Sequence, residues 1–340
     1  MNVDRLRELA IEAGLDVVGV APAGPEPTWE AYRDWVAQGY AGGMSYLERP
    51  DAIARRADPR RIMPEAQSVL VVAASYAGAL HSTLPPLHGR VSRYAWGEDY
   101  HRWLLKRLKA LVQAIAEEVG PFPYRCYVDT GPVLERAWAQ AAGLGWIGKN
   151  SCLIHPRLGS YLFLGVAIIG TALPACQPPT MPTCGACSRC IHACPTHAIV
   201  APGIIDARRC LAYLTIEHRG AIHPTLRSLA GEWVFGCDIC QQVCPWNQKA
   251  LNAHAGEVPP PEATLSLPEL LTINAQTFQD RFRHSPIWRA TPEGLARNAA
   301  VVLGNLGDPA AVAHLQHAVQ VSHAPLVREH CAWALAQLCA

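Results

Sequence analysis

Cysteine spacing constrains this chain more than any other feature of its sequence. Eight of its 13 cysteines lie between positions 184 and 244. Four follow the spacing C-x2-C-x2-C-x3-C-P from Cys184 to Pro195, three follow C-x2-C-x3-C-P from Cys237 to Pro245, and Cys210 stands between the two runs. The N-terminus lacks the apolar stretch that directs export, so we expect a reducing compartment. Metal ligation then explains clustered thiols better than disulfides do.

The first run matches the spacing with which bacterial ferredoxins bind [4Fe–4S] clusters. In that pattern three neighbouring thiolates hold one cluster, and the fourth cysteine, which precedes the proline, serves the other. We assign one cluster to Cys184, Cys187, Cys190 and Cys244, and the other to Cys194, Cys210, Cys237 and Cys240. The alternative is two zinc sites of four cysteines each. Two fully ligated clusters transfer electrons but do not react, so the chemistry must take place elsewhere.

The other cysteines are scattered, and we interpret them as small buried hydrophobic residues. They are Cys126, Cys152, Cys176, Cys331 and Cys339. The apolar stretch from Tyr161 to Leu173 is about 13 residues, too short to span a bilayer. We therefore expect a cytoplasmic protein that makes no contact with a membrane.

Helix and strand patterns alternate over the first 175 residues. Helical spacing of apolar residues predicts helices over 6–14, 103–118 and 137–145. Apolar runs predict strands over 16–21, 68–76, 124–128 and 161–171. The sequence thus predicts a multidomain protein of the α/β (α+β) class that begins with an α/β domain over 1–175. Proline-rich stretches then predict a ferredoxin-like domain over 176–250, a linker over 251–264 and an α-helical region over 265–340.

The C-terminal helices contain a repeat. Residues 299–306 align with residues 331–338 at an offset of 32, and Gly307, Asp308 and Pro309 turn the chain between paired helices. Helical hairpins of this period resemble HEAT-type units, which stack to bury their apolar faces. About one and a half units fit, so the sequence predicts a small helical cap.

Two segments of the first domain have features of a ligand site. Asp129 follows a predicted strand, where open α/β sheets gather ligands. Three glycines between Gly143 and Gly148 allow the backbone to approach a ligand closely. Neither feature is specific, because residues 129–132 could equally form a helix N-cap and a turn. The glycines do not have the spacing of a P-loop or of G-x-G-x-x-G, so nucleotide binding is not supported.

Four motifs in fixed order resemble those of the epoxyqueuosine reductases. They are residues 92–101, residues 128–136, residues 145–150 and the ferredoxin-like cysteines. The resemblance covers nearly the whole chain, with a short C-terminal helical region. It implies a nitroreductase-like first domain and a cobalamin-dependent oxidoreductase that reduces the epoxide of epoxyqueuosine, at the wobble position of tRNA, to queuosine. It also implies that Asp129 is the proton donor, a role that calls for a raised pKa.

The resemblance further implies which residues contact the cobalamin. They are Arg56, Asp129, Lys149, Asn150, Ser151, Leu153, Leu164, Cys237 and Asp238. Leu153 and Leu164 could instead belong to the core, and Arg56 could be a solvated charge. No D-x-H-x-x-G run occurs among the 14 histidines, so we expect no protein histidine on cobalt; His101 and His155 lie closest to the matched motifs. We expect a monomer that receives electrons from an external donor of the flavodoxin or ferredoxin type.

Basic and aromatic residues near the C-terminal helices predict an RNA surface. They are Arg281, Arg283, His284, Ser285, Trp288, Arg289 and Arg297. Arginine binds phosphate and tryptophan stacks on unpaired bases, so this set suits an anticodon stem-loop. With 29 basic and 28 acidic residues, no global charge attracts RNA, and the contact must be local. The alternatives are a helix-capping surface here and, for the whole chain, a corrinoid reductive dehalogenase or a non-catalytic electron carrier.

Overall fold

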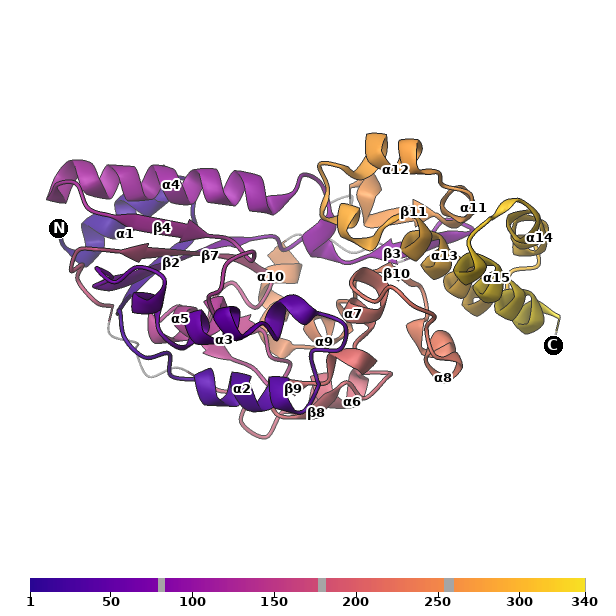
Figure 1. Ribbon diagram of the computed structural model, residues 1–340, viewed down its shortest axis with the longest axis horizontal. Helices are drawn as coiled ribbons and strands as arrows, with labels where there is room; N and C mark the ends of the chain where they lie inside the picture. Colours follow the sequence, from indigo (N-terminus) through magenta and orange to yellow (C-terminus); the bar gives the residue numbers. More distant parts are fainter. Residues whose placement is uncertain (79–82, 177–181, 254–259, 340) are drawn as a thin grey trace.

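The computed structural model describes residues 1–78, 83–176, 182–253 and 260–339. Figure 1 shows an elongated molecule with the N-terminus at one end and the last helices at the other. Residues 254–259, which belong to the predicted linker, lie outside the described residues. Within the described ranges, no helix has the length and apolar character needed to cross a membrane.

A four-stranded sheet in the order β1-β2-β7-β4 forms the centre of the N-terminal part. Its strands are β1 (Val17–Pro22), β2 (Ser68–Ser75), β4 (Tyr124–Tyr127) and β7 (Leu162–Ile169). All three pairings are antiparallel, so the fold is the α+β form of the predicted class. The four strands predicted in the first domain are therefore present.

Both faces of this sheet are covered by helices. Successive residues of a strand point to opposite faces. Leu70 and Val72 pack against α1 (Val3–Glu12) and α4 (Tyr100–Val119). Val69 and Val71 pack on the other side against α5 (Glu135–Ala141). Burial on both faces explains why β2 is a continuous apolar run without alternation.

Two helices in the N-terminal part were not predicted. They are α2 (Trp29–Ala37) and α3 (Pro50–Ala57). No residue of α2 is fully buried, and α3 buries only Ala52 and Arg56. With so little apolar surface to bury, these helices leave a weak periodic signal in the sequence. Their importance is that α3 carries Arg56, one of the predicted cofactor contacts.

A second sheet joins parts of the chain that the sequence assigned to different domains. It has the order β10-β3-β11, with β3 (His88–Val91), β10 (Trp233–Phe235) and β11 (Thr264–Ser266). Val91 shares one core with Phe235, Leu265 and the C-terminal helices. The boundaries predicted at 175, 250 and 264 therefore do not separate the hydrophobic cores. Local composition could not reveal this, because it does not encode the partner of a strand.

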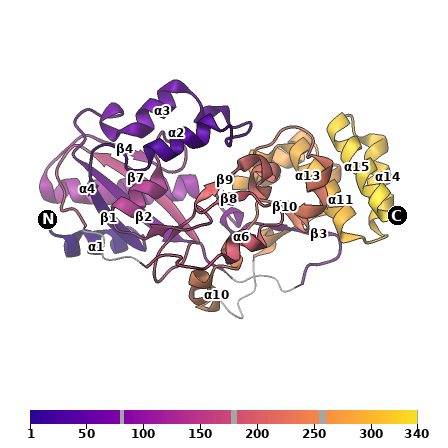
Figure 2. The ribbon, with the colours of Figure 1, turned by 90° about the horizontal axis from the view of Figure 1, so that it is seen from below.

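Short helices and hairpins make up the part of the chain that contains the clustered cysteines, and Figure 2 shows this part between the N-terminal sheet and the C-terminal helices. The helices are α6 (Arg189–Ala193), α7 (Leu211–Ile216), α8 (Pro224–Arg227), α9 (Ile239–Gln242) and α10 (Gln248–Ala253). Two small hairpins pair β5 (Trp146–Ile147) with β6 (Leu153–Ile154) and β8 (Ile199–Ala201) with β9 (Ile204–Ile205). Helices this short are held by their packing and their ligands, because isolated helices of one turn are unstable in water.

The C-terminal region is helical, as predicted. It contains α11 (Leu267–Leu271), α12 (Ala275–Phe282), α13 (Pro292–Leu306), α14 (Ala311–Val321) and α15 (Pro325–Leu338). Gly307 ends α13 with a φ of 67°, the left-handed conformation typical of a helix C-terminus. A side chain at Gly304 would meet the Ala334 backbone at 2.9 Å, so glycine allows α13 and α15 to pack closely. The predicted repeat is thus a packed helical cap.

Candidate active site and iron–sulfur centres

Asp129 lies on a tight turn directly after β4. Its φ is 59°, a left-handed conformation that is strained for a residue with a side chain and is retained mostly at functional sites. Thr130 N donates to Val128 O at 2.6 Å, and Asp129 N donates to Glu135 Oε1 at 2.6 Å. The Asp129 side chain itself is 58% exposed. The surroundings therefore fix its backbone and leave its carboxylate open to a ligand.

His101, at the start of α4, lies between two carboxylates. Its Nδ1 is 2.6 Å from Asp99 Oδ1, and its Nε2 is 3.3 Å from Asp129 Oδ2. Burial works to lower the pKa of His101, but the hydrogen bonds to Asp129 and Asp99 outweigh it and raise the pKa to about 9. His101 is therefore a charged imidazolium at neutral pH. The sequence placed His101 in a matched motif but assigned it no role.

The groups around Asp129 hold protons more tightly than Asp129 does. Burial works to raise the pKa of Asp129, but the hydrogen bond and charge of His101, with Arg289 and Tyr100, lower it below its usual value. Burial and then the charge of Asp129 raise the pKa of Glu135 to about 8. The expectation of a raised pKa for Asp129 is therefore wrong. At neutral pH the protons reside on His101 and Glu135.

A small polar group faces Asp129 from other elements. Arg289 Nε donates to Glu217 Oε1 at 2.6 Å, and the Arg289 guanidinium lies 5.4 Å from the centroid of the Tyr46 ring. Asp129 and Arg289 are close enough for the charge of each to affect the pKa of the other. Sequence reasoning missed Tyr46 and Glu217, because neither belongs to a motif and their proximity arises only from tertiary packing.

The predicted RNA-contacting segment adjoins this acid site. Asp99 N donates to the His284 carbonyl at 2.8 Å, and Arg102 Nη1 lies 2.9 Å from His284 Nδ1. These contacts tie the segment to the same turn that positions His101. The exposed members of the predicted set are Arg281, Arg283, His284, Trp288 and Arg289.

The side chains of this segment differ in their exposure and in their hydrogen-bond partners. Trp288 is 48% exposed and stacks on Phe278 with ring centroids 5.2 Å apart. Arg281 Nη1 donates to Glu269 Oε2 at 2.9 Å, so part of its charge is compensated. Ser285 Oγ accepts a backbone N–H two residues later at 3.3 Å and acts as a helix cap. The capping alternative therefore holds for Ser285 and not for the exposed arginines.

Arg297 does not belong to the RNA-contacting surface, which corrects the prediction. It is 0% exposed, and its guanidinium donates to the carbonyls of Leu214, His218 and Gly220 at 2.6 to 2.8 Å. Burial lowers its pKa to about 10. A buried arginine is stable where carbonyls satisfy its donors, and the sequence does not show which arginines find such partners.

Several of the clustered cysteines lie close to one another in space. Cys190 lies on α6, which packs against α9. Burial, and then the neighbouring Cys184 and Cys244, raise the pKa of Cys190. In the other group, burial and the neighbouring Cys210 raise the pKa of Cys237. These neighbours agree with the two sets assigned from the spacing.

The donor set fits clusters better than single ions. Within the described residues, no three or more His, Cys, Asp or Glu side chains lie close enough to share one metal ion. In a [4Fe–4S] cluster each cysteine binds a different iron atom, so its four thiolates lie farther apart than those around one zinc ion. Two groups of four thiols therefore suit two such clusters.

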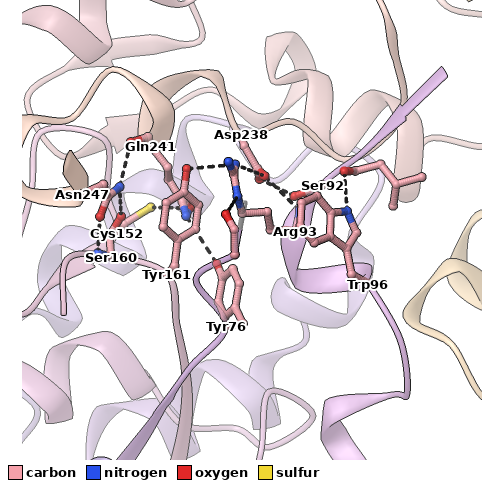
Figure 3. A network of polar contacts seen from close by, with 12 residues as sticks. Tyr76, Ser92, Arg93, Trp96, Cys152, Ser160, Tyr161, Asp238, Gln241 and Asn247 are labelled. Carbon is pink, nitrogen blue, oxygen red and sulfur yellow. Dashed lines mark hydrogen bonds and ion pairs between the residues drawn. The ribbon is translucent and has the colours of Figure 1, made fainter. Parts of the chain in front are cut away.

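A buried ion pair connects the cysteine region to the sheet domain (Figure 3). The side chains of Arg93 and Asp238 are only 1% and 4% exposed, and Arg93 Nη1 lies 3.4 Å from Asp238 Oδ2. Asp238 Oδ2 also accepts from Arg93 N at 2.9 Å, and Asp238 Oδ1 accepts from Ser92 Oγ. Arg93 Nη1 donates to Tyr161 OH at 3.2 Å. Because Asp238 directly follows Cys237, which the spacing assigns to the second cluster, this network fixes that part of the cysteine region relative to the sheet.

A second network lies beside the first one (Figure 3). Asn247 Nδ2 donates to Ser160 Oγ at 2.9 Å and to Gln241 O at 2.7 Å. Gln241 Nε2 donates to Tyr76 OH at 3.3 Å, and its Oε1 lies 3.8 Å from Cys152 Sγ. Gln241 lies on α9, next to Cys240, which the spacing assigns to the second cluster. Buried hydrogen bonds therefore join α9 to the segments next to β2 and β7.

Comparison with known proteins identifies the family. A family model described as "Epoxyqueuosine reductase QueG, DUF1730" matches residues 56–130. A relative from Xanthomonas campestris named epoxyqueuosine reductase is 42% identical and covers 98% of this chain and 95% of its own length. The chain belongs to the epoxyqueuosine reductase family. A Synechocystis epoxyqueuosine reductase is 43% identical over 83% of this chain and 98% of its own length.

Other matches cover the remaining parts of this chain. A "4Fe-4S double cluster binding domain" matches residues 183–247, and a "PBS lyase HEAT-like repeat" matches residues 295–320. A crystal structure of epoxyqueuosine reductase with an epoxyqueuosine-modified tRNA-Tyr stem loop superposes with a TM-score of 0.89 at 31% identity, covering 98% of this chain and 89% of that chain. The predicted family, fold class and iron–sulfur clusters are confirmed, and the chain is an oxidoreductase. The dehalogenase, electron-carrier and zinc alternatives are set aside.

Two predicted cofactor contacts of this chain carry buried polar atoms without partners among the described residues. Arg56 is 8% exposed, and its Nη1 is unpaired, while its guanidinium lies 5.4 Å from the Tyr32 ring. Asn150 is 2% exposed, and its Nδ2 is unpaired. A buried unpaired donor costs about 1–3 kcal/mol, so both residues fit a ligand that offers hydrogen-bond acceptors. The amide periphery of a corrinoid offers such acceptors.

The neighbours of Asn150 in the chain have other contacts. Lys149 Nζ donates to Gly185 O at 2.8 Å, so its ammonium group binds the first cysteine loop. Ser151 has a φ of 63°, and its Oγ accepts from Arg136 Nη1 at 2.8 Å. For these two residues, contact with a corrinoid stays a prediction.

The remaining predicted contacts differ in their burial. Leu153 is 3% exposed and packs in the core beside α5, so the core alternative holds for it. Leu164 is partly buried at the edge of that core and retains free surface. The Asp238 carboxylate binds Ser92 and Arg93, so its described contacts are within the protein. Cys237 belongs to the second cluster set and packs against a separate small core.

Proposed function

We propose that this chain reduces the epoxide of epoxyqueuosine at the wobble position of tRNA to queuosine, with Asp129 as the residue that delivers a proton. The observation that carries this proposal is the contact between His101 and Asp129. An imidazolium with a pKa of about 9 lies 3.3 Å from a carboxylate that is 58% exposed. This arrangement places a stored proton next to an acid that a ligand can reach.

The proposed reaction requires electrons and protons in equal number. Conversion of the epoxide into an alkene releases the oxygen as water and consumes two electrons and two protons. Each [4Fe–4S] cluster transfers one electron at a time. Cobalamin, when bound and reduced, supplies the nucleophile that opens the strained ring. We propose Arg56 and Asn150 as residues that hold it, because each has a buried donor without a partner among the described residues.

His101 and its neighbours would supply the proton for the departing oxygen. As negative charge develops on that oxygen, Asp129 takes a proton from His101 and passes it to the oxygen. Asp99, 2.6 Å from His101 Nδ1, orients the imidazole and stabilises its charge. Glu135 Oε1 accepts the Asp129 backbone N–H and keeps the turn in place.

Movement of the Asp129 turn is part of the proposal. An epoxyqueuosine reductase from Bacillus subtilis, with a TM-score of 0.87 at 30% identity over 98% of this chain and 90% of that chain, is described with its aspartate catalytic loop swung out of the active site. The φ of 59° at Asp129 supports similar movement here, because a strained backbone can relax in a second position.

We propose that the anticodon stem-loop lies on the exposed part of the segment from Arg281 to Arg289. Arginine side chains bind phosphates, and Trp288 can stack on an unpaired base. Arg289 belongs to this surface, and its charge affects the pKa of Asp129, so we propose that it contacts the nucleotide that enters the site. The relative crystallised with a modified stem loop supports this proposal.

The remaining proposals concern the cellular context. We propose that the chain is a cytoplasmic monomer and that an external protein of the flavodoxin or ferredoxin type reduces its clusters. The two clusters require such a one-electron donor, because nothing in the proposed reaction generates electrons.

The test is conversion of an epoxyqueuosine-containing anticodon stem-loop by the anaerobically reconstituted protein. With clusters, cobalamin and a chemical reductant present, we expect stoichiometric formation of queuosine, detected by mass spectrometry of the nucleosides. Omission of cobalamin should abolish it. Bound cobalamin together with unchanged RNA would contradict the proposed function.

A further inference from the structure

Trp146 has a buried donor without a partner at the base of the β5–β6 hairpin. It is 6% exposed, and its Nε1 makes no hydrogen bond to any described residue. Its ring packs in a small core with Ile154 and Cys244, against which Cys184 and Trp246 also lie. Cys184 and Cys244 belong to the set assigned to the first cluster. The ring that bears the unpaired N–H therefore packs in the same small core as two cysteines assigned to one cluster.

Other tryptophans of the chain show what an indole N–H normally finds. Trp29 Nε1 donates to Ile53 O at 3.1 Å, and Trp35 Nε1 donates to Ile205 O at 2.7 Å. Trp96 Nε1 donates to a backbone carbonyl at 2.9 Å. A buried indole N–H without an acceptor costs about 1–3 kcal/mol. Among the residues that pack with Trp146 in this small core, Cys184 and Cys244 carry sulfur atoms, so we seek its acceptor on sulfur.

We propose that Trp146 Nε1 donates a hydrogen bond to a sulfur atom of the cluster held by Cys184, Cys187, Cys190 and Cys244, and so raises the reduction potential of that cluster. Reduction adds negative charge, which spreads over the sulfur atoms. A donor aimed at sulfur stabilises the reduced state more than the oxidised state, and hydrogen bonds to the sulfurs are among the features that set cluster potentials. Trp146 is thus a positioning residue for electron transfer.

The hairpin that carries Trp146 holds this cluster loop at a second point. Lys149 Nζ, in the turn of the hairpin, donates to Gly185 O at 2.8 Å. Gly185 lies between Cys184 and Cys187 in the sequence. Two contacts from one hairpin therefore fix the first cluster loop relative to Trp146. Asn150, with its unpaired Nδ2, belongs to the same turn, so the hairpin also connects the cluster to the proposed corrinoid site.

The competing acceptor is an aromatic ring. Trp146 and Trp246 are in edge-to-face contact, with centroids 4.8 Å apart and planes at 76°. In this geometry one indole N–H can point at the other ring, which is a weak hydrogen bond. Such a contact would leave the potential of the cluster unchanged, so the two acceptors can be distinguished by experiment.

The test is a redox titration of the reconstituted Trp146→Phe protein, followed by EPR. Phenylalanine keeps an aromatic ring and removes the N–H. We expect the first cluster to become harder to reduce by about tenfold in its equilibrium constant, a negative shift of ~59 mV for one electron, with the second cluster unchanged. Trp96→Phe is the matched control, because it removes an N–H that donates to the Val91 carbonyl. It should leave both potentials as in the wild type.

Wild-type potentials in Trp146→Phe would overturn the proposal and favour the Trp246 ring as acceptor. A second measurement covers the case in which the variant does not assemble its clusters. In wild-type protein with ¹⁵N-labelled indole rings, pulsed EPR should detect ¹⁵N coupled to a reduced cluster, and Trp246→Phe should retain that signal. Absence of the coupling from the wild type would overturn the proposal. Neither measurement depends on epoxide reduction, so the inference and the proposed function fail independently.

Discussion

Replacement of His101 by glutamine tests whether His101 holds the proton that Asp129 delivers. Glutamine can hydrogen-bond to Asp99 and Asp129 but cannot carry the proton. In the wild type, the single-turnover rate should fall as the pH rises through about 9, the pKa of His101. In His101→Gln this decline with pH should be absent. The single-turnover rate at neutral pH should be lower by about 10²-fold. This is the lower end of the effect of general acid–base catalysis, and we choose it because Asp129 is still present in the variant.

The same replacement has a calculable effect on stability. The pKa of His101 rises from 6.5 to about 9 in the folded protein, so its stabilising contribution is complete below pH 6.5 and is lost as the pH rises through 9. A shift of this size, from 6.5 to about 9, corresponds to at most about 3.4 kcal/mol. Because Asp129 is 58% exposed, solvent screening reduces the expected value to about 1–2 kcal/mol.

Two assays measure these effects. One is the single-turnover rate with pre-reduced protein and the modified stem-loop between pH 6 and 10. The other is the apparent free energy of unfolding in urea over the same range. Replacement of the exposed His314 by glutamine, on α14, is the matched control. If His101→Gln and the wild type depend on pH in the same way in both assays, the reasoning that His101 holds the proton is refuted.

Further predictions concern the buried pair and the RNA surface. Asp238→Ala should lower the free energy of unfolding by about 3–5 kcal/mol, because Arg93 loses its buried counter-charge; an unchanged urea midpoint would contradict this. Arg283→Glu should weaken stem-loop binding and reduce its salt slope by about one, measured by fluorescence anisotropy, while Arg7→Glu on α1 should not. Arg297→Ala should lower stability by several kcal/mol, at about 1–3 for each buried carbonyl left unpaired. If Arg297→Ala were as stable as the wild type but bound RNA more weakly, the conclusion that Arg297 lies outside the RNA surface would be contradicted.

The sequence predicted those features that depend on local spacing. The cysteine runs predicted two [4Fe–4S] clusters, because ligands of one loop must follow each other at fixed intervals. The strand β2 and the helix α4 were predicted because each buries a long apolar face. Gly307 marked a helix end because only a few residues tolerate its left-handed backbone.

The sequence did not predict features that depend on distant residues. β3 pairs with β10 and β11, and no local pattern specifies those partners. Tyr46 and Glu217 reach the neighbourhood of Asp129 only through tertiary packing around Arg289. The sequence grouped Arg297 with exposed basic residues. In the structure it is buried, and backbone carbonyls accept its hydrogen bonds. The lowered pKa of Asp129 likewise depends on His101, 28 residues away in the chain.

The central claim is that Asp129 delivers the proton to the epoxide oxygen. Its most direct test is the single-turnover rate of Asp129→Asn, loaded with clusters and cobalamin, on the epoxyqueuosine stem-loop. Asparagine has nearly the same shape but cannot donate as an acid. We predict a rate lower by at least about 10²-fold, with stem-loop affinity and cobalamin content unchanged. A wild-type rate in Asp129→Asn would contradict the claim.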